Sequence, residues 1–166
     1  MLATVTLENG LSFSGEMFGA AVPAWGEIVF HTGMVDYERV LTDKCYDRKV
    51  VVMTYPLVGN CGLGKEQMKK EPVIAGLIVA DICQQPQHWG RQRSISEYLQ
   101  YYGIPGLSGV DTRALLRTVQ MTGGTARASL IPALWTQSIS RLSRDQGNLD
   151  RKDASFLVGR KEQQSA

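Results

Sequence analysis

The sequence predicts an α+β domain of the layered β/β/α kind with a polar C-terminal tail. Segments with strand patterns come first along the chain and segments with helix patterns follow, which disfavours a regular βαβ repeat. A length of 166 residues, 43% of them hydrophobic, suits one domain with its own core. We expect this domain over residues 1–130, and a polar tail or linker, partly disordered, over residues 131–166.

Four segments carry strand patterns. Thr4 to Phe18 is expected to form a hairpin, because apolar and hydroxyl side chains alternate on both sides of Asn9-Gly10, a dipeptide that favours a type I′ turn. Glu27–His31 is a short expected strand. Val50–Tyr55 and Val73–Ile82 are apolar at consecutive positions, which is typical of central strands buried on both faces.

Two helices are expected in the last third of the domain. Ser94-Ile95-Ser96-Glu97 has the spacing of a capping box, and the apolar side chains that follow recur at helical spacing up to Tyr102, before Gly103. A second helix is expected from about Asp111, ending before Gly123-Gly124. These helices complete the elements on which the α+β prediction rests.

Composition excludes several classes of partner. Eighteen Lys and Arg against sixteen Asp and Glu give a net charge of +2, too small to indicate nucleic-acid binding. No apolar run approaches the roughly 18 residues of a membrane span, and the N-terminal residues lack the features of a signal peptide. We therefore expect a cytoplasmic protein without a membrane or nucleic-acid partner.

The nucleophilic and metal-ligating residues form no recognisable site in the sequence. Cys45, Cys61 and Cys83 have no metal-ligand spacing, and each is expected to be a buried, inert thiol. His31 and His88 are expected to be hydrogen-bonded structural residues, since nothing pairs them with a cysteine or a carboxylate. We expect no cofactor, no metal and no catalytic residue in this chain.

One segment resembles a phosphate-binding loop. Gly59–Lys65 satisfies G-x-x-x-x-G-K after an apolar strand. Glu66 follows, where that loop needs a hydroxyl for Mg²⁺, and Pro72 leaves room for only a short helix. The simpler interpretation is a glycine-rich surface turn, and nucleotide binding stays an alternative.

Four longer motifs resemble one family, the small chain of carbamoyl-phosphate synthetase. They are, in order along the chain, LENGLSFSGEMFGA, GEIVFHTGMVDYERVLTDKCYD, TYPLVGNCG and SISEYLQYYGIPGLSGVDTRALLR. The resemblance is collinear over about Leu2 to Leu130, which makes it far more specific than the phosphate-loop pattern. GNCGLGK then becomes a variant of a family turn rather than a phosphate-binding loop.

The resemblance implies a docking function. In the family this region is the N-terminal β/β/α domain, which docks on the large synthetase subunit and packs beside a glutamine amidotransferase domain of the same chain. The holoenzyme makes carbamoyl phosphate from glutamine for pyrimidine and arginine synthesis. The amidotransferase signatures are absent from these 166 residues, so we expect the non-catalytic half. A stand-alone binding module that lost the partner is the alternative.

One departure from the family pattern concerns a candidate site residue. The family's LTDPSY is LTDKCY here, so Lys44 and Cys45 replace a proline and a serine. That serine approaches the glutamine pocket of the neighbouring domain in the family. Cys45 is therefore a candidate substrate-binding residue by resemblance, although a thiol is a poor hydrogen-bond donor.

Overall fold

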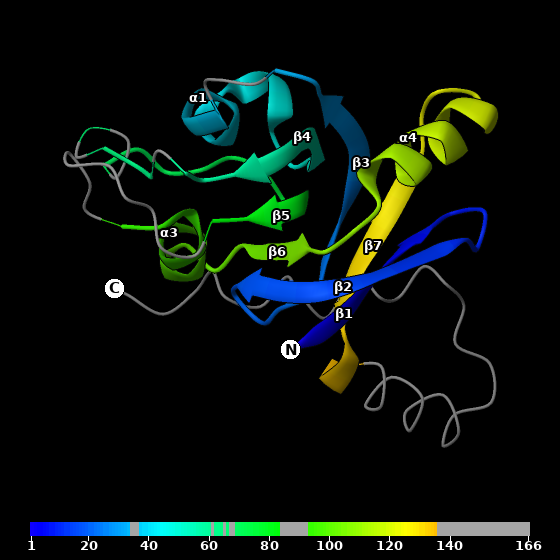
Figure 1. Cartoon of the computed structure of the whole chain (residues 1–166), viewed down its shortest axis with the longest axis horizontal. Helices are drawn as coiled ribbons and strands as arrows, with labels where there is room; N and C mark the ends of the chain where they lie inside the picture. The colour runs from blue at the N-terminus through cyan, green and yellow to red at the C-terminus, as the bar shows by residue number, and fades with distance from the viewer. Residues whose placement is uncertain (34–36, 61, 65, 67–68, 84–92, 136–166) are drawn as a thin grey trace, which may run out of the picture. The chain divides into compact units, whose positions relative to one another are not determined.

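The computed structural model describes residues 1–33, 37–60, 62–64, 66, 69–83 and 93–135. The chain divides into two compact units, Met1–Ala133 and Leu134–Ala166. The strands and helices of the first unit are, in chain order, β1 (Leu2–Leu7), β2 (Ser12–Gly19), β3 (Ala24–His31), α1 (Tyr37–Thr42), the 3-10 helix η1 (Lys44–Tyr46), β4 (Val50–Val58), β5 (Gly76–Ile82), α3 (Ile95–Tyr101), β6 (Pro105–Ser108), α4 (Thr112–Met121) and β7 (Arg127–Pro132) (Figure 1). Residues 136–166, most of the expected tail, lie outside the described residues.

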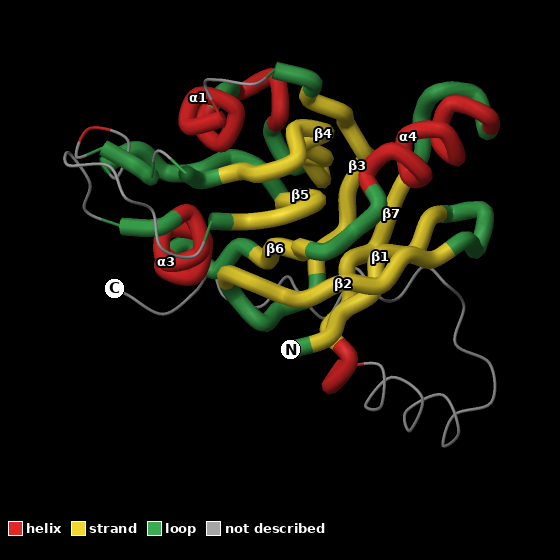
Figure 2. The backbone as a smooth tube through the Cα atoms, in the orientation of Figure 1, coloured by secondary structure: helices red, strands yellow, loops and turns green. Residues whose placement is uncertain are grey.

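The seven strands form one mixed sheet that closes on itself in the order β1-β2-β6-β5-β4-β3-β7 (Figure 2). β3, β4, β5 and β6 pair in parallel, whereas β1, β2 and β7 make antiparallel pairs. Each described strand therefore pairs with a neighbour on both sides, which is how closed sheets avoid exposed edges. The sheet and its helices confirm the α+β class. The layered β/β/α description stays a prediction.

The predicted order of elements is wrong in three places. α1 precedes β4, and both β6 and β7 follow helices, so the strands are not confined to the first half. β6 has only four residues, with the sequence PGLS, and carries no alternating pattern. It forms a strand because it pairs with β2 on one side and β5 on the other. The local sequence does not predict this pairing.

The β1–β2 hairpin is confirmed, but its predicted type I′ turn is wrong. The Leu7 N–H donates to the Leu11 carbonyl at 2.9 Å, and the Gly10 N–H donates to the Leu7 carbonyl at 2.9 Å. Gly10 has φ +87, whereas Asn9 has no positive φ. The loop therefore has three residues, Glu8 to Gly10, and Gly10 at its end adopts the left-handed conformation. The longer loop lets the Glu8 N–H donate to the Arg127 carbonyl of β7 at 3.0 Å.

The two predicted central strands are buried on both faces, as expected. Val50 and Val52 of β4 belong to the cluster inside the closed sheet, together with Leu115 and Val119 of α4. Val51 on the opposite face of β4 belongs to a second cluster, which also contains the buried side chains of α1 and α3. Figure 1 shows α3 and α4 at opposite ends of the sheet. The helices therefore cover different apolar surfaces of the same strands.

Both predicted helices start where the sequence places them. The Ser94 hydroxyl accepts the Glu97 N–H at 3.2 Å, and the Glu97 carboxylate accepts the Ser94 N–H at 2.9 Å, which is a complete capping box. Asp111 caps α4 by accepting two backbone N–H groups. Among the described residues, none of the helices has the length and apolar character needed to cross a membrane.

Candidate functional site

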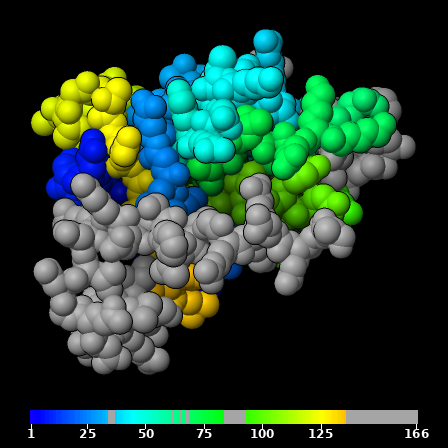
Figure 3. Space-filling view, turned by 180° about the vertical axis from the view of Figure 1, so that it is seen from behind, coloured from blue at the N-terminus to red at the C-terminus, as the bar shows by residue number. Residues whose placement is uncertain are grey.

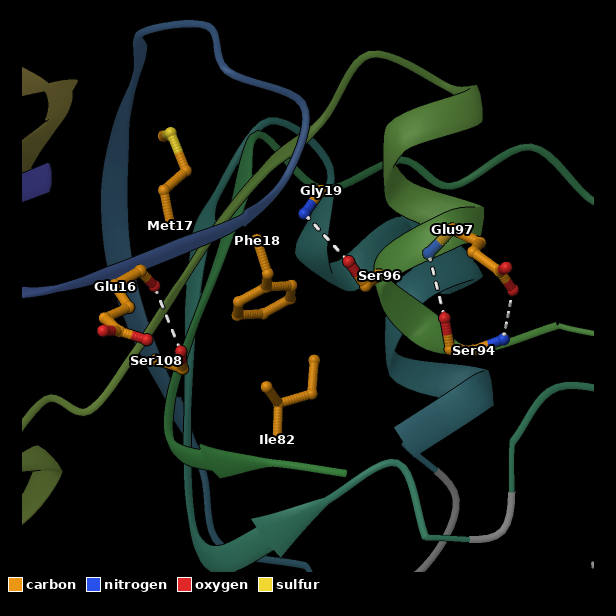
Figure 4. A pocket seen from close by; sticks show the side chains of 9 residues that line it. All are labelled: Glu16, Met17, Phe18, Gly19, Ile82, Ser94, Ser96, Glu97 and Ser108. Atoms are coloured by element: carbon orange, nitrogen blue, oxygen red, sulfur yellow. Dashed lines mark hydrogen bonds between the residues drawn. The ribbon is translucent and has the colours of Figure 1, made fainter. Parts of the chain in front are cut away.

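A hollow of about 440 Å³ lies where the end of β2, the end of β6 and the start of α3 meet (Figure 4). We call it the β2–α3 hollow. Its lining includes two carboxylates, three hydroxyls and an apolar strip, contributed by Glu16, Glu97, Ser94, Ser96, Ser108, Phe18 and Ile82. Figure 4 shows Phe18 and Ile82 between Glu16 and Ser108 on one side and the serines of α3 on the other. A surface that combines these groups can bind a polar group with an apolar stem.

Four hydrogen bonds fix the walls of the hollow. The Ser108 hydroxyl donates to the Glu16 carbonyl at 3.1 Å, which joins β6 to β2 by a side chain as well as by the sheet. The Gly19 N–H donates to the Ser96 hydroxyl at 3.2 Å and joins β2 to α3. The capping box then fixes the first turn of α3. The hollow is therefore held by bonds that join β2 to α3 and β6, across 77 and 92 positions of the chain.

The apolar floor depends on a glycine opposite an aromatic ring. Phe18 lies directly across from Gly106 in the β2–β6 register. A Cβ on Gly106 would lie 2.3 Å from a carbon of the Phe18 ring, so the ring covers the glycine and there is no room for a side chain. Position 106 requires glycine because the Phe18 ring approaches its backbone closely. The backbone conformation is not the reason, since the φ of Gly106 is not in the left-handed region.

A second, shallower hollow of about 370 Å³ adjoins the first on the outer side of α3. It shares Glu97 and is otherwise lined by Arg93, Gln100 and Tyr101. The Arg93 guanidinium lies 5.9 Å from the centre of the Tyr101 ring, and Tyr101 is 70% exposed. An exposed Tyr–Arg pair is of the kind that is enriched at protein–protein interfaces.

Cys45, the site residue suggested by resemblance, lies in η1 away from this hollow and is exposed, so its predicted burial is wrong. Figure 3 shows the segment that carries it, in cyan, at the surface of the first unit. Asp43 caps η1 by accepting the Cys45 N–H at 2.9 Å, which lowers the pKa of that carboxyl. The Asp43 side chain raises the pKa of the Cys45 thiol, first by hydrogen bonding and then by its negative charge. The group remains a thiol at neutral pH, which is a weak nucleophile.

His31 supports the turn that carries Cys45. Its Nδ1 lies 3.2 Å from the Tyr46 hydroxyl, and the two rings meet edge to face. The structural, hydrogen-bonded role predicted for His31 is confirmed at this nitrogen. Within the described part of the chain, its buried Nε2 has no hydrogen-bond partner, and a Cβ on Gly33 would lie 2.5 Å from it. The chain after β3 therefore packs tightly against the imidazole.

The segment that resembles a phosphate-binding loop begins as a turn. Gly59 has φ +93, and the Gly62 N–H donates to the Gly59 carbonyl at 3.0 Å, so this N–H is not free to bind a phosphate. Leu63 is then buried and pairs with Arg93 in an isolated bridge. Lys65, the residue that would contact phosphate, lies outside the described residues.

The remaining sequence candidates do not join a site in the described part of the chain. Cys83 is half-buried rather than fully buried, and its N–H donates to the Val58 carbonyl at 2.8 Å. Cys61 and His88 lie outside the described residues. No group of three or more His, Cys, Asp or Glu side chains among the described residues is placed to hold a metal ion.

Sequence reasoning did not find the β2–α3 hollow. The Ser94–Glu97 capping box was the one local signal that pointed to it, because it places the start of α3. Glu16, Phe18 and Ser108 carry no motif of their own, and only the pairing of β6 with β2 brings them beside α3.

The family model for the carbamoyl-phosphate synthase small chain, CPSase domain, matches residues 5–130. The carbamoyl phosphate synthase pyrimidine-specific small chain of Bacillus subtilis is 40% identical over 124 residues, which are 74% of this chain and 34% of the relative. The small chain of Streptococcus agalactiae is 40% identical over 132 residues, 79% of this chain and 37% of the relative. That of Symbiobacterium thermophilum is 45% identical over 118 residues, 70% of this chain and 32% of the relative.

The chain spans about a third of the length of the curated relatives that it matches. Among solved structures, a peptidase M28 precursor from Shewanella amazonensis matches 78% of this chain and 33% of its own, with a TM-score of 0.37 and 8% identity. A likeness at that level carries no argument. The matches to small chains, in contrast, extend from β1 to β7 and include every element of the closed sheet.

Proposed function

Because this chain belongs to the carbamoyl-phosphate synthase small-chain family, we propose that it is the docking domain that binds a large synthetase subunit. The observation that carries the proposal is the extent of the match. Residues 5–130 cover the closed sheet with α1, α3 and α4, so the whole folded domain corresponds to the CPSase domain of the small chain. The proposed function therefore rests on the identity of this domain and not on a catalytic residue.

The chemistry of the described residues supports a binding role. Cys45 is exposed, and the neighbouring Asp43 disfavours its thiolate form further by raising the pKa of the thiol. The exposed Arg93–Tyr101 pair and the β2–α3 hollow are surfaces suited to a partner rather than to a bond-breaking reaction. We propose that the domain contributes to glutamine-dependent carbamoyl phosphate synthesis in the cytoplasm, supplying pyrimidine and arginine synthesis, through its partners.

Cys45 has a proposed place in that assembly. η1 presents its side chain at the surface, and the Asp43 cap and the His31–Tyr46 contact support the turn. By its position in the motif LTDKCY, we propose that it faces the glutamine pocket of an amidotransferase domain. The raised pKa of the thiol suits a neutral contact with a substrate amide and not a nucleophilic attack.

Binding to the large subunit is tested by mixing the purified chain with the large synthetase subunit encoded by the same genome. We expect co-elution in size-exclusion chromatography and a saturable heat of binding in titration calorimetry. Separate elution with no heat at concentrations of about tens of micromolar, at which a complex with a micromolar Kd would form, would contradict docking and favour the stand-alone module. The chain alone is expected to release no glutamate from glutamine in the same preparation.

A further inference from the structure

We propose that the β2–α3 hollow accepts a basic side chain, an arginine or a lysine, from the protein on which this domain docks. The inference rests on the proposed docking function and adds to it the face that docks and the charge of the partner's contact residue.

The hollow offers acceptors, because each rim carboxylate has about four lone-pair sites and several of the donors in the lining are used within the domain. The Gly19 N–H is bound to the Ser96 hydroxyl, and the Ser94 N–H is bound to the Glu97 carboxylate. The Ser108 O–H is directed at the Glu16 carbonyl, which leaves the lone pairs of its oxygen. A guanidinium or an ammonium has only donors, and therefore matches these groups.

Among the described residues, the rim carries two negative charges and no positive one. Glu16 and Glu97 both line the hollow, both are exposed, and none of its described lining residues is a lysine or an arginine. Among the described residues, the ion pairs join Arg39 to Asp43 and Lys69 to Glu66, so neither rim carboxylate has a cationic partner. Arg93 lies on the outer side of α3, where it stacks on Tyr101. The charged end of a basic side chain that enters the hollow would be attracted to the rim carboxylate that it approaches.

The apolar strip suits the stem of a long basic side chain. Phe18 and Ile82 lie between the two polar sides of the hollow (Figure 4), and Ile82 is buried. Lysine and arginine bury their methylene groups on apolar surface while the charged end stays with polar groups. A small inorganic cation would leave this strip uncovered. A basic side chain uses the strip and the rim together.

The test neutralises the rim without removing the helix cap. In the double variant Glu16→Gln, Glu97→Gln, glutamine at position 97 still completes the capping box, so α3 keeps its first turn. The matched control is Glu8→Gln, Glu27→Gln, which makes the same change in net charge at two exposed positions outside the hollow. Both double variants are titrated with the large synthetase subunit at several salt concentrations.

We expect the rim variant to bind at least about tenfold more weakly, the lower end for close charge pairs at an interface. Its Kd should also depend less on salt than that of the unchanged chain. The control should stay within about twofold, as is usual for charges away from a contact. A rim variant that binds like the unchanged chain would overturn the proposal for the hollow and leave the docking function standing.

A second measurement distinguishes failure of the hollow from failure of docking. N-acetyl-arginine amide is titrated into the labelled chain, and the backbone amide signals of Gly19, Ser96 and Ser108 are followed by NMR. We expect these signals to shift with millimolar half-saturation, as for one ion pair with a few hydrogen bonds, and to be unaffected by the uncharged citrulline analogue. If the unchanged chain does not bind the large subunit, the proposed docking function is wrong. If the NMR signals also do not shift, the proposed binding of a basic side chain in the hollow is wrong as well.

Discussion

Gly15→Ala is expected to disrupt the contact between β2 and β6 that supports the β2–α3 hollow. Gly15 is buried in β2, and a Cβ added to it would lie 2.3 Å from the Ser108 carbonyl oxygen. Ordinary contact begins near 3.4 Å, so the two strands would have to separate by about an ångström. The atom in the way belongs to the backbone, and no side-chain rotation can relieve the clash.

The expected cost follows from that geometry. Insertion of one methyl group into a packed interior costs about 1–3 kcal/mol, and an immovable backbone neighbour places Gly15→Ala at about 3 kcal/mol. With an m-value of about 2 kcal/mol per molar urea, the midpoint of unfolding should fall by about 1.5 M. Urea unfolding followed by circular dichroism and by tryptophan fluorescence measures this change.

Gly10→Ala is the matched control. Gly10 has φ +87 but has no atom within 4 Å of its added Cβ, so its cost is the left-handed backbone alone, about 1–2 kcal/mol. The reasoning is refuted if Gly15→Ala unfolds at the same urea concentration as the unchanged chain. It is equally refuted if Gly15→Ala is no less stable than Gly10→Ala, because the clash would then add nothing.

Three further outcomes are expected. Ser94→Ala should cost about 1 kcal/mol in urea unfolding because it removes the cap of α3, while Glu97→Gln, which keeps the capping box, should change stability by less than about 0.5 kcal/mol. Leu115→Ala, at a fully buried position of α4, should lower the free energy of unfolding by about 3 kcal/mol, and a change below about 1 kcal/mol would contradict the packing of α4 against the sheet interior. Asp43→Asn should lower the pKa of the Cys45 thiol toward its ordinary value. In a chain whose other two cysteines are replaced by serine, the pH profile of iodoacetamide modification should therefore move to lower pH. An unchanged profile would show that Asp43 does not act on the thiol.

Local signals in the sequence predicted the elements that local interactions stabilise. The capping box at Ser94 and Glu97 satisfies N–H groups within four residues, so its pattern is complete in the sequence. The two-sided burial of β4 was equally visible, because a strand with apolar residues at every position has no face for solvent. The Asn9-Gly10 turn was located correctly but its type was not, and the observed loop bonds to a distant strand, from the Glu8 N–H to the Arg127 carbonyl.

The elements that were missed depend on neighbours from distant parts of the chain. β6 has four residues and becomes a strand because Glu16–Gly19 of β2 pairs with it on one side and β5 on the other. β7 likewise closes the sheet between β1 and β3. The exposure of Cys45 was also outside the reach of sequence reasoning, since it depends on how η1 lies on the surface.

By itself, the sequence determined the α+β class, the starts of both main helices, the strands buried on both faces and the family, through motifs that extend over most of residues 5–130. Only the tertiary structure decided the closed order of the sheet and the β2–α3 hollow. The physical reason is the distance along the chain: Glu16, Ile82, Ser96 and Ser108 meet because β6 inserts between β2 and β5. Such contacts are selected by packing and by the satisfaction of backbone hydrogen bonds over the whole sheet, which no short segment encodes.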